Sequence, residues 1–281
     1  MSTPAGIGVS QNYFATLFAV VRRSAAQLVQ PASQLRRAEA AQRLSRQLWL
    51  LAAIAAVAIP ALMFEVDVFE IKLIPPRGTP GLWPVRILTD FGRDGYVLWA
   101  LGVTLIAVTV STPWLRGVTR TRLLGFATQL QFLFFAVLLP LLAGEAIKWI
   151  AGRGRPFVGG KADAFNFVPF AGSEAHASFP SAHAITAVAL AFAVSALWPR
   201  ARLAMGAYAI LIVLSRLVLL AHHPSDVIAG ALIGLSGALA VRYWFAARAL
   251  CFAIGHNGEI LPLAVRSHAG RKGVAGEAAA P

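Results

Sequence analysis

The sequence predicts an all-α fold, an integral membrane bundle of six transmembrane helices. Of its 281 residues, 58% are hydrophobic and only 13% are charged, and the mean hydropathy is +0.67. Soluble domains carry roughly 25% charged residues, so this composition suits a membrane interior better than water. The apolar residues gather in six runs of about the length that crosses a bilayer, and basic connections separate several of them.

The basic residues indicate topology and lipid contact. The formal net charge is +13 and the pI is about 11.3, values that also occur in nucleic-acid-binding proteins. Here, however, the arginines and lysines stand at the edges of apolar runs and not in one polar domain. We therefore expect contacts with anionic lipids at the cytoplasmic face and no nucleic-acid partner.

Residues 1–47 are expected to form a basic cytoplasmic arm, with six arginines against one acid, Glu39. The apolar stretch 13–21 is too short to span a bilayer. No charged region precedes it and no small-residue cleavage site follows soon after, so it does not resemble a signal peptide. An interfacial amphipathic helix and a disordered arm remain equal alternatives for this segment.

Residues 48–250 are the expected transmembrane domain. The six apolar runs cover residues 48–64, 96–115, 123–147, 181–198, 203–221 and 227–247. The connection 65–95 is rich in proline and glycine, which excludes a regular long helix, and it is expected to hold a short interfacial element around residues 83–88. Residues 251–281 are expected to form a cytoplasmic tail that is disordered.

The charge of the connections orients the bundle. Arginines without acids lie between runs two and three and between runs four and five, whereas connection 65–95 carries mixed charge. Basic connections stay in the cytoplasm, so both termini are expected there. The ends of runs one, three and five, with the starts of runs two, four and six, then face outward.

Three polar clusters fall at these outward ends, although the orientation was derived without them. Run three ends in Lys148 and is followed by Arg155-Pro156; run four begins with Pro180-Ser181-Ala182-His183. Run five carries Ser215-Arg216 and ends at His222, and Asp226 begins run six. A charge inside an apolar run is costly unless it is paired or lines a wet cavity, so Arg216 in particular points to a site.

The residue types in these clusters suit phosphate chemistry. A helix that begins at Pro180 would present the N–H groups of Ser181, Ala182 and His183 to an anion. Lys148, Arg155 and Arg216 supply three cations that could surround a phosphate. His183 can deliver a proton, and a histidine followed by Asp226 is a usual nucleophile and orienting group. The residues alone leave His222 and His223 as alternatives, and their spacing suggests no metal.

The pattern Lys148-x6-Arg155-Pro156, Pro180-Ser181-x-His183, Ser215-Arg216-x5-His222-x3-Asp226 resembles the three-part signature of the type 2 phosphatidic acid phosphatase family, which includes the vanadium haloperoxidases. The match covers about residues 148–230, and the six-run layout is similar to the family's membrane members. Ala182 stands where the family usually has glycine, and His223 where it commonly has an aromatic residue.

The resemblance implies a role for each of these residues. His222 would be the nucleophile that forms a phosphohistidine, Asp226 would hold its other ring nitrogen, and His183 would protonate the leaving oxygen. The phosphoryl oxygens would be bound by Lys148, Arg155, Ser181, Arg216 and the backbone at Ala182 and His183. Three further residues, Arg153, Lys161 and His176, are weaker candidates for the edge of the site.

The sequence thus predicts a metal-independent membrane phosphatase with no cofactor, acting on a lipid phosphate or diphosphate at the periplasmic face of a bacterial inner membrane. Undecaprenyl diphosphate, phosphatidylglycerol phosphate, phosphatidate and lipid A phosphate all remain open as substrates, and so does the oligomeric state. A phosphotransferase with the same site is the main alternative. A vanadate-dependent haloperoxidase and a non-catalytic transporter fit less well, because the apolar runs and the charges at one interface argue against them.

Overall fold

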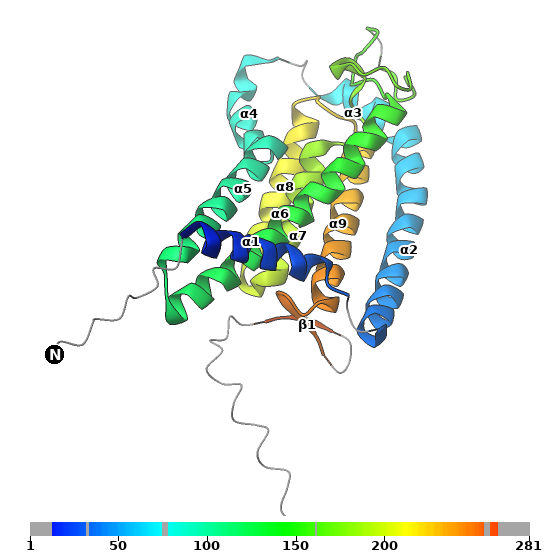
Figure 1. The fold of residues 1–281 in the computed structure, drawn as a ribbon. Helices are drawn as coiled ribbons and strands as arrows, with labels where there is room; N and C mark the ends of the chain where they lie inside the picture. Colours follow the sequence, from blue (N-terminus) through cyan, green and yellow to red (C-terminus); the bar gives the residue numbers. More distant parts are fainter. Residues whose placement is uncertain (1–12, 32–33, 75–77, 161, 256–258, 264–281) are drawn as a thin grey trace, which may run out of the picture.

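The computed structural model describes residues 13–31, 34–74, 78–160, 162–255 and 259–263. Within them the chain is helical except for connections and one small two-stranded sheet (Figure 1). The elements are α1 (Tyr13–Val29), α2 (Gln34–Glu65), α3 (Asp67–Leu73), α4 (Trp83–Asp90), α5 (Asp94–Ser111), α6 (Gly117–Ala151), α7 (Ala182–Leu197), α8 (Arg202–Val218), α9 (Pro224–Ala247), β1 (Phe252–Ile254) and β2 (Ile260–Pro262).

The fold confirms an all-α membrane bundle but not the full count of six spans. Among the described residues, five helical segments are long and apolar enough to cross a bilayer: 40–65, 80–114, 117–151, 199–218 and 224–247. The fourth predicted span corresponds to α7, which has only 16 residues. An α7 of this length rises about 24 Å, less than the roughly 30 Å hydrocarbon core of a bilayer.

Helix α7 lies at the centre of the bundle and packs against α6, α8 and α9. Its sequence is rich in alanine, and most of its alanines are buried. Small residues also bring α9 close: a Cβ at Gly230 would lie 2.5 Å from the Ser181 carbonyl oxygen, and one at Gly234 would lie 2.5 Å from the Ile185 carbonyl oxygen. This Gly-x3-Gly spacing allows the backbones of the two helices to meet, as small residues do in membrane helices.

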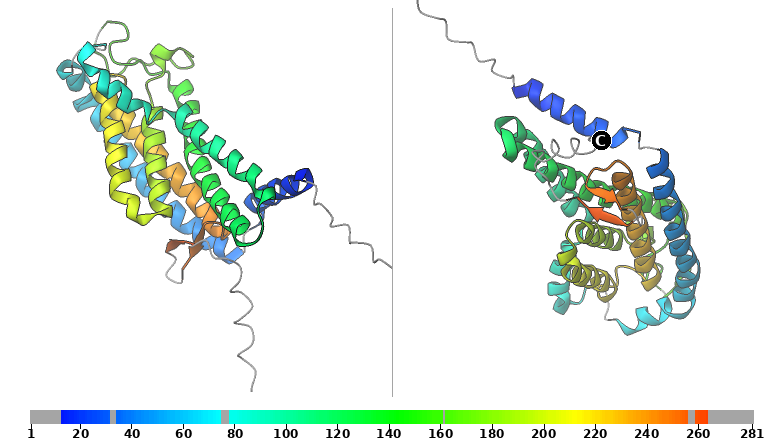
Figure 2. Two further views of the ribbon diagram at one scale, coloured as in Figure 1. Left: turned by 90° about the vertical axis from the view of Figure 1, so that its left-hand side faces the viewer. Right: turned by 90° about the horizontal axis from the view of Figure 1, so that it is seen from below.

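Two ends of the bundle are distinct in Figures 1 and 2. One end carries α3, the connection 152–181 and the corner between α8 and α9. The other carries α1, the β1–β2 hairpin and the corners between α5 and α6 and between α7 and α8. The predicted site residues belong to the first end, and the acid-free arginine connections to the second.

Helix α1 lies across the second end of the bundle, at a steep angle to the long helices (Figure 2). Its first residue, Tyr13, stacks on Trp114 and donates a hydrogen bond to the Val110 carbonyl oxygen at 2.9 Å. Near its other end, Trp244 Nε1 donates to the Leu28 carbonyl oxygen at 3.1 Å. Of the two alternatives for this segment, the structure has the helix. The predicted arm also contributes the first turns of α2.

The predicted disorder of residues 251–281 is wrong for the part of the tail that the structure describes. Strands β1 and β2 pair antiparallel as a hairpin, and Leu263 N donates to the Cys251 carbonyl oxygen at 2.8 Å. Phe252 is fully buried and packs edge-on against Phe132 at 4.8 Å between ring centroids. The hairpin is therefore part of the core; residues 264–281 lie outside the described residues.

The described part of the connection 65–95 contains two short α-helices, α3 and α4, instead of one long one, as its prolines and glycines predict. Helix α4 confirms the expected element around residues 83–88 and packs against α8. A Cβ on Gly92, just past α4, would lie 2.3 Å from Ile212 Cγ2, so glycine permits this close contact. Helix α3 was not predicted, and it brings Asp67 to the start of α9.

Candidate active site

The three predicted motifs lie together at the end of the bundle that carries α3 (Figure 1). The first follows α6, the second precedes α7, and the third occupies the corner between α8 and α9. The chain leaves α6 sharply because Gly152 has a left-handed backbone with φ of 55°, and a Cβ there would lie 1.8 Å from the Val168 carbonyl oxygen. Glycine is therefore required at this turn.

His222 is buried in the corner between α8 and α9, and its ring is held by backbone. Its Nδ1 lies 2.8 Å from the carbonyl oxygen of Ser178. A carbonyl oxygen can only accept, so Nδ1 carries the hydrogen and Nε2 keeps the free lone pair of the neutral ring. This tautomer makes Nε2 the atom able to attack an electrophile.

The surroundings of His222 favour the neutral ring. Burial lowers its pKa well below the usual 6.5, and the positive charge of Arg216 lowers it further. The charge of Asp226 and the hydrogen bond to Ser178 act in the opposite direction but are smaller effects. At neutral pH the imidazole is therefore uncharged, as a nucleophile must be.

Asp226 does not hold the His222 ring directly, which differs from the contact that the resemblance implies. Its nearer carboxylate oxygen is 3.9 Å from His222 Nδ1, too far for a hydrogen bond. That oxygen, Oδ2, instead accepts from Ser178 Oγ at 2.6 Å and from the backbone N–H of His223 at 2.9 Å. Asp226 caps α9, which begins at Pro224, and its hydrogen-bonded link to His222 runs through Ser178.

His223 stands beside the nucleophile candidate but has a different environment. Its Nδ1 lies 3.1 Å from Asp226 Oδ2, and the side chain forms the other half of the capping box. His223 is fully buried. His223 is thus held at the start of α9 by its contact with Asp226.

Helix α7 begins at Ala182, two residues after the predicted start at Pro180. Ser181 is its N-cap, and the Ser181 N–H donates to the Asp226 carbonyl oxygen at 3.0 Å, so that donor is not free for an anion. The first-turn donors are the N–H groups of Ala182 and His183. The Ser181 hydroxyl is fully buried and has no hydrogen-bond partner in the described part of the chain. A buried donor left unpaired in this way is costly, which indicates a place for a ligand oxygen.

Lys148, Arg155 and Arg216 approach the histidines from three segments. The charges of all three act electrostatically on the His183 ring. Lys148 forms an ion pair with Glu145, three residues earlier on α6. Arg155 Nε donates to the Glu174 carbonyl oxygen at 2.9 Å.

Arg216 contacts the connection 65–95, and Arg93 belongs to that connection. Arg216 is almost fully buried at the end of α8, and its Nη1 donates to Thr89 Oγ1 on α4 at 2.9 Å. Arg93, just before α5, also acts electrostatically on His183. Its guanidinium lies 5.0 Å from the centre of the Tyr96 ring. Arg93 was not predicted, because no local sequence pattern indicates that α4 packs against α8.

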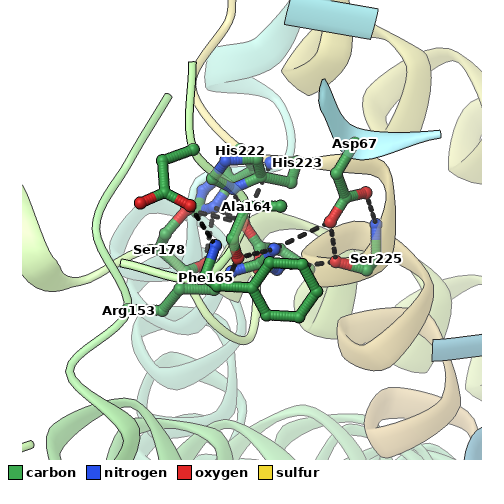
Figure 3. Close-up of polar contacts among 10 residues, drawn as sticks. Asp67, Arg153, Ala164, Phe165, Ser178, His222, His223 and Ser225 are labelled. Atoms are coloured by element: carbon green, nitrogen blue, oxygen red, sulfur yellow. Dashed lines mark hydrogen bonds and ion pairs between the residues drawn. The ribbon is translucent and has the colours of Figure 1, made fainter. Parts of the chain in front are cut away.

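Arg153 lies at the centre of a buried network instead of at the edge of the site. Its Nη1 donates to Asp226 Oδ1 and to Ser225 Oγ, and its Nη2 donates to Asp67 Oδ2 (Figure 3). We call Asp67, Arg153, Ser225 and Asp226 the Arg153 cluster; all four are fully buried. Asp67 and Ser225 were not predicted.

The two other weak candidates are not brought into this network by the described contacts. His176 lies in a short turn at residues 174–176, where its Nδ1 is 3.1 Å from Ser173 Oγ. Lys161 lies outside the described residues. Within the described residues no three His, Cys, Asp or Glu side chains are placed to hold a metal ion.

These features define a class of protein. Several apolar helices carry at one end a group of cations around two histidines, a helix N-terminus and an unpaired buried hydroxyl. Such a set is suited to binding and polarising a phosphate ester, and it is typical of a membrane-embedded phosphatase.

Within that class, the chain belongs to the PAP2 superfamily, whose family model matches residues 129–250. It is similar to a lipid A 1-phosphatase of Rhizobium johnstonii, with 31% identity over 75% of this chain and 84% of that relative. It is also similar to a lipid A 1-phosphatase of Rhizobium etli, with 38% identity over 48% of this chain and 57% of that relative. No solved structure matches the chain. The protein is thus a multi-pass membrane lipid phosphatase.

Proposed function

We propose that this protein removes the 1-phosphate of lipid A at the periplasmic face of a bacterial inner membrane, through a phosphohistidine intermediate at His222. The observation that carries the proposal is the placement of a neutral His222, with Nε2 free, among the cations of the three motifs. Both curated relatives are named lipid A 1-phosphatases, which supports the substrate.

In the first step, His222 Nε2 attacks phosphorus and the bond from phosphorus to the lipid oxygen breaks. The negative charge of the bound phosphate offsets the cations around His183, so the ring holds a proton in the complex. His183 gives this proton to the departing oxygen, and the lipid leaves as an alcohol. Lys148, Arg155 and Arg216 offset the charge of the phosphoryl oxygens, and the Ser181 hydroxyl and the N–H groups at the start of α7 donate to them. The transfer needs little beyond positioning and neutralised charge.

In the second step, water attacks the phosphoryl group and the bond from phosphorus to Nε2 breaks. His183, now without its proton, accepts one from that water as it attacks. Inorganic phosphate leaves, and His222 returns to the neutral tautomer held by Ser178. The positive charge on the His222 ring in the intermediate is stabilised by Asp226, whose carboxylate is 3.9 Å away.

A cavity next to this site suits the lipid portion. Its volume is about 850 Å³, and its walls come from α2, α6 and α9. Phe179 and Ile147 line it and are the chain neighbours of Ser178 and Lys148, so the cavity adjoins the site. At the other end of the bundle it is lined by Leu28 and Trp244. An apolar cavity that runs from the site along the membrane-facing helices fits alkyl chains.

The proposed orientation rests on charge. Exposed arginines mark the end opposite the site, and basic segments stay in the cytoplasm. They include Arg22, Arg23, Arg116, Arg122, Arg200 and Arg202. On α1, exposed Phe14 and Phe18 accompany Arg22 and Arg23, a combination that favours contact with anionic lipids at that surface. In reconstituted vesicles, the melting temperature should rise with the anionic lipid fraction, and added salt should remove that effect.

The function is tested by measuring inorganic phosphate released by the purified protein. Lipid A 1-phosphate should be hydrolysed with a higher kcat/KM than undecaprenyl diphosphate, phosphatidylglycerol phosphate or phosphatidate. The matched control is a His222→Gln preparation, which reports phosphate from contaminants. Release that does not depend on an added acceptor alcohol distinguishes hydrolysis from phosphoryl transfer. Preference for another of these lipids would overturn the proposed substrate, and no release from any would overturn the reaction.

A further inference from the structure

We propose that Asp67 and Arg153 are positioning residues that hold the His222 ring for attack through Asp226 and Ser178, without touching the substrate. This inference rests on the proposed function, since it takes His222 to be the nucleophile. Asp67 lies in the connection between the first two long apolar segments, 86 residues before Arg153. Asp67 lies outside the three motifs that carry the resemblance, and Arg153 occupies one of the variable positions of the first motif.

Asp67 joins α3 to the start of α9. Its Oδ1 accepts from the Ser225 backbone N–H at 3.0 Å, and its Oδ2 accepts from Ser225 Oγ at 2.6 Å. The same Oδ2 lies 2.7 Å from Arg153 Nη2. One carboxylate thus satisfies a first-turn donor of α9 and one side of the guanidinium.

Arg153 connects that carboxylate to the second one, on Asp226. Its Nη1 lies 2.5 Å from Asp226 Oδ1, and its Nε and Nη2 both donate to the Ala164 carbonyl oxygen, at 3.0 and 2.7 Å. Figure 3 shows Arg153 close to Ala164, Ser225 and Asp67. Since the fork of an arginine is planar and rigid, these bonds fix the direction in which Asp226 presents its other oxygen.

The last links run from Asp226 to the nucleophile. Asp226 Oδ2 accepts from Ser178 Oγ at 2.6 Å, and the carbonyl oxygen of the same Ser178 accepts from His222 Nδ1 at 2.8 Å. A shift of the Asp226 carboxylate therefore moves Ser178, and with it the acceptor that sets the angle of the His222 ring. In-line attack depends on that angle.

A positioning role predicts a specific kinetic pattern. The cations that bind phosphate lie outside the Arg153 cluster, so loosening the cluster should leave phosphate binding nearly intact while slowing the chemical step. A change in a partner that orients a reactive histidine commonly costs about 10- to 100-fold in activity, a range taken from metal-bound histidines. A purely structural role would instead lower the amount of folded protein and leave the kcat of the folded fraction unchanged.

The test uses the full chain in detergent with Asp67→Asn, which keeps the shape and removes the charge. We expect kcat for lipid phosphate to fall about 10- to 100-fold, with KM and the inhibition constant of inorganic phosphate changed less than about threefold. Asp163→Asn is the matched control: Asp163 is an exposed residue of the loop after α6 whose Oδ1 accepts from Phe165 N at 2.8 Å, and it should keep wild-type kcat.

Ser225→Ala provides a second variant that keeps both carboxylates and the guanidinium, so it tests the cluster if Asp67→Asn does not fold. It removes only the hydroxyl shared by Arg153 and Asp67, and it should lower kcat by a smaller factor. Wild-type kcat in either folded variant would overturn the positioning role, and so would a loss of phosphate affinity as large as the loss in kcat. If the wild-type protein itself releases no phosphate, the proposed function fails and this inference fails with it.

Discussion

The carbonyl oxygen of Ser178 lies 2.8 Å from Nδ1 of His222, whereas the nearer carboxylate oxygen of Asp226 is 3.9 Å away. The hydrogen on Nδ1 is therefore donated to a backbone carbonyl oxygen. This oxygen does not take up the proton, and it cannot rotate away as a side chain could. Asp226 makes its hydrogen bond to the hydroxyl of Ser178 and so orients the His222 ring indirectly. His222 is thus held in one tautomer by the segment that precedes α7, which also supplies Ser181 and His183.

This environment predicts activity in mildly acidic solution. The pKa of His222 is lowered from 6.5, so the ring loses its proton at a lower pH than free histidine and stays neutral as the pH falls below 6.5. The acid limb of the plot of kcat/KM against pH should therefore lie below 6.5. The plot is measured on the purified enzyme with a substrate whose own ionisation is known. An acid limb above 6.5 that belongs to the enzyme would contradict the lowered pKa.

Glu70 predicts a pH dependence of stability. Burial, followed by the charges of Asp67 and Asp226, raises its pKa from 4.5 to about 7, and its carboxylate oxygens have no hydrogen-bond partner among the described residues. The folded state thus keeps this proton longer than the unfolded chain, so stability falls as the pH rises from 4.5 through about 7. The Glu70→Gln variant should not show this loss of stability with rising pH. Thermal unfolding at about pH 5 and about pH 8 measures it, and a parallel decline in both proteins would refute the assignment.

The contact between α7 and α9 should not tolerate a methyl group at Gly230. A Cβ there would lie 2.5 Å from the Ser181 carbonyl oxygen and 3.0 Å from Ala184 Cβ, so Gly230→Ala should shift the start of α7. We expect a lower melting temperature and a lower kcat. Gly206→Ala on α8 is the control, because a Cβ there meets nothing within 4 Å. Alanine has less conformational freedom than glycine in the unfolded chain, so Gly206→Ala should stabilise the folded protein by about 0.5–1 kcal/mol. Equal melting temperatures for the two variants would argue against the close packing.

The apolar cavity predicts a selective effect on long-chain substrates. Ala55 lines it from α2, and Ala55→Trp should fill part of its volume. KM for a long-chain lipid phosphate should rise about tenfold, equivalent to about 1.4 kcal/mol of lost contact. Hydrolysis of a small water-soluble phosphate ester should not change. Ala53→Trp on the exposed side of the same helix is the control. An equal effect of both substitutions would show that the cavity does not receive the chain.

Much of the architecture could be predicted because it follows from local sequence. Apolar runs and acid-free basic connections gave the helices and their relative directions, and α5, α6, α8 and α9 begin and end within about six residues of the predicted runs. The site motifs fall at helix ends, where proline and glycine mark the boundaries. Pro224 occupies the first position of α9 and Gly152 the turn after α6, positions that these residue types favour.

The features that the sequence could not predict depend on contacts between segments that are distant in the chain. The bond from Asp67 to Ser225 spans 158 residues, and no local pattern marks Asp67 as different from other acids in its connection. The place of Ser178 beneath His222 likewise depends on how the segment before α7 packs on the corner between α8 and α9. The hairpin was not predicted because Phe252 packs against Phe132, a residue of α6 that is distant from it in the sequence.

The most direct test of the central claim is to trap the covalent intermediate. The enzyme is mixed with lipid phosphate, quenched within the first turnovers under alkaline conditions that preserve phosphohistidine, digested, and mapped by mass spectrometry. The account predicts a phosphoryl group on His222 in the wild-type protein and its loss in His222→Gln, with His223→Gln still labelled. A phosphoryl group on His223 or His183, or turnover with no labelled histidine at any quench time, would contradict it.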